Sequence, residues 1–320
     1  MTSLSSEDDS PLSGLNVVSG TRLLLLENEY TLQRRSFKTG IKSIDAQFPN
    51  LFSIGAVIGL GATEARDRTL SIHIIATALA SSVAAGSEKG LKPDSLNGSL
   101  DIFFLASPTS TIISELHDLL QRRLPVPSSS TAEEASLQLL DNVKLLQYLD
   151  LAGLVEGLSE ISQTLHNLQE ERPRPSILLM EGLSSALSTA QRRSGNMQIA
   201  ALVANLVRTL IQLSRSSQSL LVLVELDVEI SPGDSEGGIL GSAFSSGKGE
   251  KLRAVPRGIV GEVLEEGMDV VALIHAGFGK TKTAKGKDTK TRTIIVETVK
   301  DRVGSRSGEW STWVQESVNP

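Results

Sequence analysis

Short apolar runs of strand length alternate along the chain with longer segments in which apolar residues recur every three or four positions. Between residues 154 and 168, five apolar residues lie at steps of 4, 3, 4 and 3, which places them on one face of a helix. The continuous run SILLMEG, residues 176–182, is typical of a strand that is buried on both faces. Repeated strand and helix units of this length predict a parallel sheet with right-handed crossovers.

The same pattern predicts where the elements lie. Predicted strands cover residues 56–58, 100–105, 143–148, 176–182 and 220–225. Predicted helices cover residues 69–82, 112–123, 154–168 and 199–213, with a further helix near 258, whereas residues 126–136 are predicted to form a solvated loop. In the last third, residues 270–276 and 292–299 predict an antiparallel hairpin, and a final strand is expected near residues 310–314.

Composition favours one large α/β domain. The chain has 320 residues, of which 40% are hydrophobic, and this is enough for a substantial core. Residues 1–20 are rich in Ser, Asp and Glu and predict a flexible acidic tail, so we expect a single core domain over residues 21–316. No run is expected to be long enough to span a membrane, and the acidic start is unlike a signal peptide, so we expect a soluble intracellular protein.

Charge and cysteine content exclude several classes of site. The formal net charge of -6 limits any nucleic-acid contact to local basic patches. The absence of cysteine excludes disulfides and thiolate metal sites, and the four scattered histidines offer no metal-ligand spacing. We therefore expect no bound metal.

Residues 52–79 have the layout of a strand, a phosphate loop and a helix. A phosphate loop, GxxxxGK[ST], needs glycines for close backbone approach, a lysine to neutralise charge and a hydroxyl to hold magnesium. In the better of two registers, Arg68 and Thr69 occupy the Lys and Ser/Thr positions. Both glycines are lost, because Ala62 and Asp67 stand in their places. We expect either a degenerate turn without nucleotide or weak ATP and magnesium binding through Arg68 and Thr69.

The run TGIKSIDAQFPNLFSIGAVIGLGATEARDRT resembles the core entry of the RecA-like strand-exchange recombinases and their recombination paralogues. The residues that match this framework are Thr39, Gly40, Ile44, Asp45 and Gly55. Counting from Gly55 without a gap again places the family's Lys-Thr pair on Arg68 and Thr69. The resemblance covers roughly residues 20–316 and implies a RecA-like core with a degenerate nucleotide site.

The resemblance also implies roles for residues at later strand ends. In the family, the second strand ends in an acidic residue that activates water. Ala106 and Ser107 stand there in this chain, and neither can act as a general base. The family's magnesium-associated aspartate corresponds to Glu181, which is either a solvated or hydrogen-bonded acid or a metal ligand. The family's polar sensor residue, at the end of a later strand, corresponds to Glu225 or Asp227. The resemblance therefore implies a pseudo-ATPase.

Two basic segments are candidates for contact with a phosphate backbone. The first resembles the second DNA-facing loop of the recombinases and contains Lys248, Lys251, Arg253 and Arg257. The second contains Lys280, Lys282, Lys285, Lys287, Lys290 and Arg292 and is opposed only by Asp288. Such loops suit a nucleic-acid backbone without reading its sequence, although a solvated hairpin tip is the simpler explanation of the second segment.

A run of four leucines near the start is a candidate contact surface. It consists of Leu23, Leu24, Leu25 and Leu26. The run is too short to span a membrane and too apolar to stay exposed to water, so it either packs on its own domain or adds to a neighbouring subunit.

The resemblance implies a non-catalytic or weakly ATP-binding recombination paralogue, like a subunit of the Shu complex. Such a subunit would be nuclear, would associate with other RecA-fold paralogues and with single-stranded or branched DNA, and would assist a recombinase in homologous recombination and DNA repair. The alternatives are a structural RecA-fold subunit of another assembly, such as the Elongator accessory subcomplex that acts on transfer RNA, and an ATPase with an unusual loop.

Overall fold

The computed structural model describes most of the chain after residue 35. The described residues are 36–62, 69–87, 100–124, 129–171, 174–217, 219–231, 242, 251–255, 258–276, 291–302 and 304–316. The chain divides into two units, Met1–Arg35 and Ser36–Pro320, and the fold given below is that of the second. The predicted tail, residues 1–20, and the leucine run, residues 23–26, lie outside the described residues.

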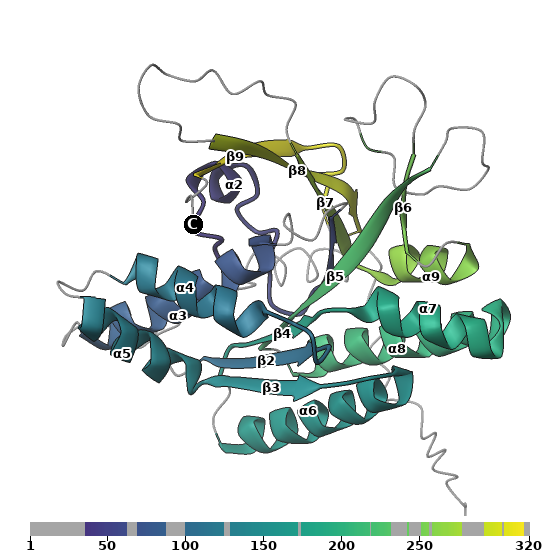
Figure 1. Cartoon of the computed structure of the whole chain (residues 1–320), viewed down its shortest axis with the longest axis horizontal. Coiled ribbons are helices and arrows are strands. Elements are labelled where there is room, and N and C mark those ends of the chain that lie inside the picture. Colours follow the sequence, from purple (N-terminus) through teal and green to yellow (C-terminus); the bar gives the residue numbers. More distant parts are fainter. Residues whose placement is uncertain are drawn as a thin grey trace, which may run out of the picture. The chain divides into compact units, whose positions relative to one another are not determined.

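A nine-stranded sheet forms the centre of the described fold, in the order β3-β2-β4-β5-β1-β7-β8-β9, with β6 paired to β5 (Figure 1). The strands are β1 (Val57–Ala62), β2 (Asp101–Ala106), β3 (Val143–Gln147), β4 (Ser176–Met180), β5 (Leu220–Ser231), β6 (Lys251–Ala254), β7 (Val270–Ala276), β8 (Thr291–Asp301) and β9 (Trp310–Glu316). From β3 to β7 all neighbours pair in parallel, whereas β7, β8 and β9 pair antiparallel.

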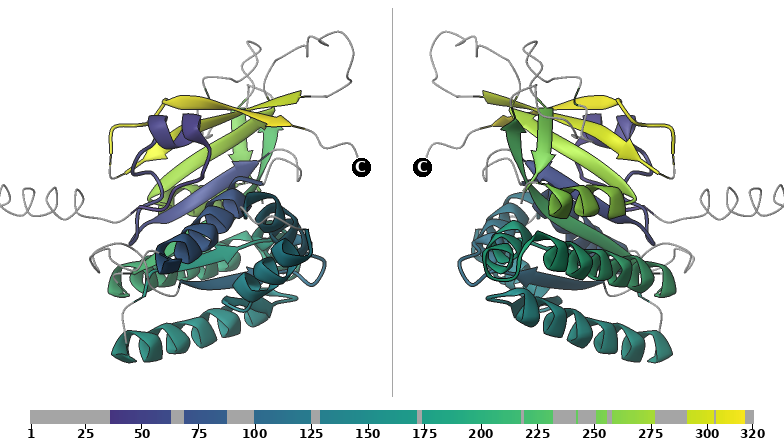
Figure 2. Two further views of the ribbon diagram at one scale, coloured as in Figure 1. Left: turned by 90° about the vertical axis from the view of Figure 1, so that its left-hand side faces the viewer. Right: turned by 90° about the vertical axis from the view of Figure 1, so that its right-hand side faces the viewer.

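Helices cover both faces of this sheet (Figure 2). They are α2 (Lys42–Gln47), α3 (Thr69–Ser87), α4 (Ile112–Arg123), α5 (Ser129–Leu140), α6 (Leu151–Glu171), α7 (Leu183–Ser194), α8 (Asn196–Ser216) and α9 (Ile259–Gly267). Alternate residues of β1 enter two separate hydrophobic clusters, because successive strand side chains point to opposite faces. Leu60 packs with α3 and α4, whereas Val57 packs with α6 to α9.

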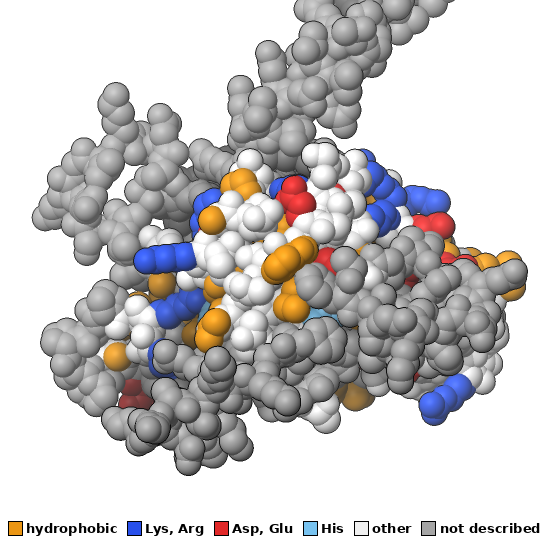
Figure 3. All heavy atoms as spheres, turned by 90° about the horizontal axis from the view of Figure 1, so that it is seen from above, with side chains coloured by type: hydrophobic (Ala, Val, Ile, Leu, Met, Phe, Trp, Pro, Cys, Tyr) orange, Lys and Arg blue, Asp and Glu red, His pale blue; other side chains and the backbone are white. Residues whose placement is uncertain are grey.

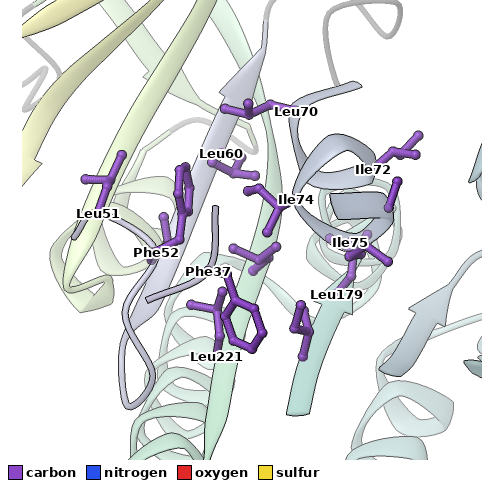
Figure 4. Packing of buried hydrophobic residues seen from close by; sticks show 14 of the residues in the cluster. Phe37, Leu51, Phe52, Leu60, Leu70, Ile72, Ile74, Ile75, Leu179 and Leu221 are labelled. Carbon is purple, nitrogen blue, oxygen red and sulfur yellow. The ribbon is translucent and has the colours of Figure 1, made fainter. Parts of the chain in front are cut away.

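The first cluster holds β1 against α3. Figure 4 shows Leu70 and Ile74 of α3 pointing toward Leu60 of β1. All three side chains are at most 2% exposed. Burying a leucine or isoleucine side chain stabilises a fold by roughly 1.5–3 kcal/mol, so this packing fixes where α3 begins relative to the end of β1.

The predicted fold class is confirmed at the level of an α/β fold with a mostly parallel sheet, flanking helices and a C-terminal antiparallel hairpin. The predicted solvated loop over residues 126–136 is wrong, because α5 begins at Ser129 and ends at Leu140. Ala132 and Leu139 are buried in this helix, and Ser136 is fully buried with its hydroxyl donating to the Glu133 carbonyl at 2.7 Å. The prediction of a loop relied on the serine content of the segment and gave too little weight to the helical spacing of its small and apolar residues.

Helix α8 bears on the expectation that no run is long enough to span a membrane. It is 21 residues long and contains an 18-residue apolar window with a mean hydropathy of 1.3, so by length and composition alone it could cross a membrane. In the fold, its apolar stripe, which includes Val203, Leu206 and Leu210, packs on the sheet, and 44% of the apolar window is buried. A core helix of a soluble protein passes the same test, so this is weak evidence for a span.

The residues that match the family framework before β1 form a hydrogen-bonded anchor. The Asp45 carboxylate accepts the Thr39 N–H at 2.8 Å, the Thr39 hydroxyl at 2.9 Å and the Gly40 N–H at 3.0 Å. Gly40 has φ 74°, and a Cβ there would lie 2.5 Å from the Thr77 hydroxyl of α3. Because only glycine fits this conformation and this space, and because the Thr77 hydroxyl donates to the Thr39 carbonyl at 2.8 Å, Thr39, Gly40 and Asp45 have a structural role in holding the segment before α2 against α3.

Candidate functional site at the carboxyl edge of the parallel strands

The carboxyl ends of β1, β2, β4 and β5 meet at one edge of the sheet. Ligands of open parallel sheets bind at this edge, between neighbouring strands whose following helices cover opposite faces. Three neighbouring pairs meet this condition, because α3 and α4 cover one face whereas α6, α7 and α9 cover the other. One is β2–β3, and the other two carry the residues predicted for the site. We call them the β2–β4 junction, where β2 leads to α4 and β4 to α7, and the β1–β5 junction, where β1 leads to α3 and β5 toward α9.

Glu181 lies at the β2–β4 junction, as its place at the end of the predicted strand indicated. Its backbone N–H donates to the Leu105 carbonyl of β2 at 2.9 Å. Its carboxylate accepts a hydrogen bond from the Ser110 hydroxyl, and its own carbonyl accepts the Tyr148 hydroxyl at 2.6 Å. The residue is half-buried, so its second carboxylate oxygen can face solvent or a ligand.

Tyr148 holds the backbone of Glu181 in place. The residue is 3% exposed, and its burial together with the nearby Glu181 carboxylate raises the pKa of the phenol well above its ordinary value. The phenol therefore keeps its proton throughout the physiological range and acts as a hydrogen-bond donor. No local sequence pattern indicates this contact, because Tyr148 follows an edge strand and lies 33 residues before Glu181.

The end of β2 supplies hydroxyls where the resemblance to the recombinases implies a carboxylate. Ala106 ends the strand, and the Ser107 hydroxyl lies 3.2 Å from that of Thr109. Gly182, with φ 79°, approaches so closely that a Cβ there would lie 3.3 Å from that of Ser107. Among residues 106–111, all of which are described, none is acidic or basic. The β2–β4 junction therefore offers one carboxylate, three hydroxyls and a phenol, which suits hydrogen bonding better than proton abstraction.

Thr69 begins α3 at the β1–β5 junction, whereas Arg68 lies outside the described residues. The Thr69 hydroxyl is buried and has no hydrogen-bond partner in the described part of the chain. A hydroxyl at the start of a helix is placed to meet an anion, because the first N–H groups of the helix point the same way. Thr69 is thus compatible with weak phosphate binding, which stays a prediction.

Ser71 and Glu225 fill the inner part of the same junction. The Ser71 hydroxyl of α3 donates to the Glu225 carboxylate of β5 at 2.6 Å, and Glu225 is 5% exposed. Glu225 lies beside Leu60 in the β1–β5 pairing, and Asp227 lies beside Ala62. Of these two candidates for the sensor position, Glu225 contacts α3. In the sequence, the only indication that Ser71 forms a buried hydrogen bond was its position as a polar residue in the apolar first turn of α3.

Few of the predicted DNA-binding residues can be placed. The backbones of Lys251 and Arg253 lie in β6, paired with Ser231 and Glu229 of β5, and that of Arg292 lies in β8. The remaining seven lie outside the described residues: Lys248, Arg257, Lys280, Lys282, Lys285, Lys287 and Lys290. In Figure 3, the coloured Lys and Arg side chains form small separate groups, with uncharged and acidic side chains between them. Contact with nucleic acid therefore stays a prediction that depends on the two loops.

A cluster that sequence reasoning missed lies on the neighbouring strands β7 and β8. Glu297 of β8 is fully buried, and its carboxylate accepts the Ser242 hydroxyl at 2.5 Å. His275 of β7 lies 3.2 Å from the same carboxylate oxygen. Hydrogen bonds to a charged carboxylate are among the strongest in proteins. The cluster therefore fixes Ser242, which lies in the chain between β5 and β6, against β8 of the sheet.

His73 has the structural role expected for a histidine in an apolar helix. Its ring contacts the Arg123 guanidinium of α4 and packs edge-on against Trp313 of β9, with ring centroids 4.5 Å apart. Burial and the Arg123 charge lower the pKa of His73 to about 3. The imidazole is therefore neutral at pH 7, and it is part of the contact between α3, α4 and β9.

No group of three or more His, Asp or Glu residues in the described ranges lies close enough together to hold a metal ion. Glu181 and Glu225 each use carboxylate oxygens for hydrogen bonds to serine hydroxyls. No protein-family model matches the chain, and no curated protein matches its sequence. The fold and the two junctions are thus the basis of the proposal that follows.

Proposed function

We propose that the chain is a recombination paralogue with a RecA-like core that binds ATP weakly or not at all and acts through DNA and partner subunits. The observation that carries this proposal is the composition of the β2–β4 junction. Ala106 and Ser107 end the strand where a hydrolase needs a base, and the carboxylate and backbone of Glu181 are tied by Ser110 and Tyr148. Such a junction keeps its shape without providing ATP hydrolysis.

The positions of the two basic segments support the DNA part of the proposal. The first begins before β6, includes that strand and ends before α9, and the second follows β7 and ends in β8. β6 pairs with β5, and β5 and β7 are the two neighbours of β1 in the parallel sheet, so the two segments adjoin strands on either side of β1. Two cationic loops so placed can follow one phosphate backbone. The Ser242–Glu297–His275 cluster ties the chain six residues before Lys248 to β7 and β8, the strands that flank the second segment.

A titration of DNA binding against salt tests this proposal. The probe is a fluorescein-labelled 40-nucleotide single strand, measured by anisotropy at several salt concentrations. The variant changes Lys280, Lys282, Lys285 and Lys287 to Glu. We expect weaker binding and a flatter dependence of log K on log salt, because each lost phosphate contact lowers the slope by about 0.7 for a single strand.

A matched control carries four charge reversals elsewhere on the described surface: Lys144, Arg192, Arg193 and Arg208 to Glu. The control has the same net charge as the lysine variant. Any difference in DNA affinity between the two variants therefore comes from the loop itself and not from the overall charge. Equal affinity of the lysine variant and the wild type would refute the role of this loop in DNA binding.

The alternative is a structural RecA-fold subunit of another assembly, such as the Elongator accessory subcomplex, which requires the same degenerate junction. The two proposals differ in nucleic acid and in partners. Stronger binding of transfer RNA than of single-stranded DNA in the same titration favours the alternative. Mass spectrometry of proteins that co-purify with the tagged chain separates them again, since recombination paralogues support the first proposal and Elongator subunits the second.

A further inference from the structure

An open groove of about 840 Å³ lies between α6, α7 and α8, in the helical layer opposite α3 and α4. Its lining is largely apolar and includes Val155 and Leu202, which are 55% and 44% exposed. At the start of α8, two residues before Ile199 of the lining, Met197 is 72% exposed. A contiguous apolar surface of this kind marks an interaction site, because single exposed apolar residues are common but grouped ones are not.

The shape of the groove suits a helix. On each wall the lining residues recur at helical spacing, for example Leu151, Val155 and Ser162 on α6. The lined stretch of α6, residues 151–162, is about 17 Å long, which corresponds to about three turns of a partner helix. Small lining residues, Ala186 and Ala190 of α7, let a partner helix approach closely.

The charges around the groove favour an acidic occupant. Arg193 lines the groove, and Arg208 donates to the side chain of Asn205, another lining residue, at 3.0 Å. Within the described part of the chain, neither guanidinium forms an ion pair. The carboxylate of Asp150, which also lines the groove, accepts the Gly153 N–H at 2.9 Å and so caps the start of α6. Two guanidiniums therefore remain to pair with a ligand.

We propose that this groove binds an amphipathic helix of a partner protein, with an apolar stripe along one face and carboxylates that pair with Arg193 and Arg208. The leucine and valine side chains supply most of the affinity, because they lose apolar area to water contact on binding. The arginines at the rim supply orientation and selectivity for acidic helices. The lining of the groove includes none of the residues that define the two junctions, so this inference does not depend on the proposed function.

Fluorescence anisotropy with two designed peptides tests the proposal. Both are labelled helices of 14 residues with one leucine stripe; one carries three Glu beside the stripe, and the other has Lys at those positions. With the full-length protein, we expect the Glu peptide to bind about five- to tenfold more tightly than the Lys peptide. Leu202→Glu should abolish binding of the Glu peptide, and the double change Arg193→Glu and Arg208→Glu should reverse the preference.

The matched control is Leu145→Glu, since Leu145 lies on β3 away from the groove and is 43% exposed, close to the value for Leu202. Circular dichroism verifies that each variant is folded. Equal binding of both peptides, or unchanged binding in Leu202→Glu, would overturn the proposal. Two further results would overturn it by assigning another occupant: a wild-type dimer that Leu202→Glu dissociates, or tighter binding by a peptide of residues 19–32 of this chain than by the Glu peptide.

Discussion

The two junctions at the carboxyl edge of the sheet contain the same chemical pair in different surroundings. At the β1–β5 junction, Ser71 donates to a Glu225 carboxylate that is 5% exposed and lies between β5 and α3. At the β2–β4 junction, Ser110 donates to Glu181, which is half-buried and belongs to a loop. The first pair therefore connects two core elements, whereas the second remains within reach of a ligand.

This difference shows that a carboxylate at the end of a parallel strand is not by itself evidence of a nucleotide site. Burial decides its role, because a buried charge must be neutralised or hydrogen-bonded by its own protein. Glu225 meets that requirement through α3, and it then holds the start of the helix in place. Glu181 is less confined and keeps part of its hydrogen-bonding capacity.

The largest effect is expected from Ser71→Ala. The change leaves the buried Glu225 carboxylate short of a donor, and losing a hydrogen bond to a charged group costs about 1.5–3 kcal/mol of unfolding free energy. Chemical denaturation monitored by circular dichroism measures it. In a double-mutant cycle with Glu225→Gln we expect a coupling above about 1 kcal/mol, whereas Ser110→Ala with Glu181→Gln should give a smaller one. Equal couplings would contradict the distinction between the junctions.

The pH dependence of stability tests the packing of α3, the helix on which the buried junction depends. The pKa of His73 is lowered from 6.5 to about 3 in the folded state, so stability is complete above pH 6.5 and falls as the pH drops toward 3. Between pH 7 and pH 5 we expect His73 to account for a loss of about 2 kcal/mol.

The comparison is between the wild type and His73→Gln, each unfolded with denaturant at both pH values. The variant should lose less stability than the wild type on acidification, since it lacks the group that gains a proton on unfolding. His166→Gln is the control, because His166 is exposed on α6. An identical pH dependence for the wild type and His73→Gln would show that His73 is not held neutral by its surroundings.

A smaller effect is expected from Tyr148→Phe. Removing the phenol hydroxyl leaves the Glu181 carbonyl without its 2.6 Å donor, and the loss of a neutral hydrogen bond costs about 1 kcal/mol. The urea midpoint measures this loss. If the loop is also released, hydrogen exchange at Glu181 and Gly182 should accelerate while that at β4 stays unchanged. Faster exchange throughout β4 would instead show that Tyr148 stabilises the sheet as a whole.

Much of the fold followed from periodicity in the sequence. The helix predicted over residues 112–123 has those bounds in the structure, and the apolar run from Ser176 is a strand buried along its whole length. These elements are decided by local spacing and burial. The α5 helix was missed because three consecutive serines, residues 128–130, and the acidic pair Glu133 and Glu134 conceal its weaker apolar spacing.

The site was less accessible to sequence reasoning. The position of Glu181 followed from the end of a predicted strand, and that of Thr69 from the alignment of the chain with the phosphate-loop pattern. Their partners did not, since Ser71 and Glu225 are 154 residues apart, and Ser110 and Glu181 are 71 apart. Such pairs depend on the strand order β2-β4-β5-β1, which no local pattern encodes.

Thermal unfolding with and without magnesium-ATP tests most directly the central claim, which is that the folded protein binds ATP weakly or not at all. The account predicts that millimolar magnesium-ATP leaves the melting temperature of the wild type unchanged within about 1 °C, because a ligand that binds weakly contributes little stability. A rise of several degrees that disappears in Arg68→Ala and in Thr69→Ala would contradict it.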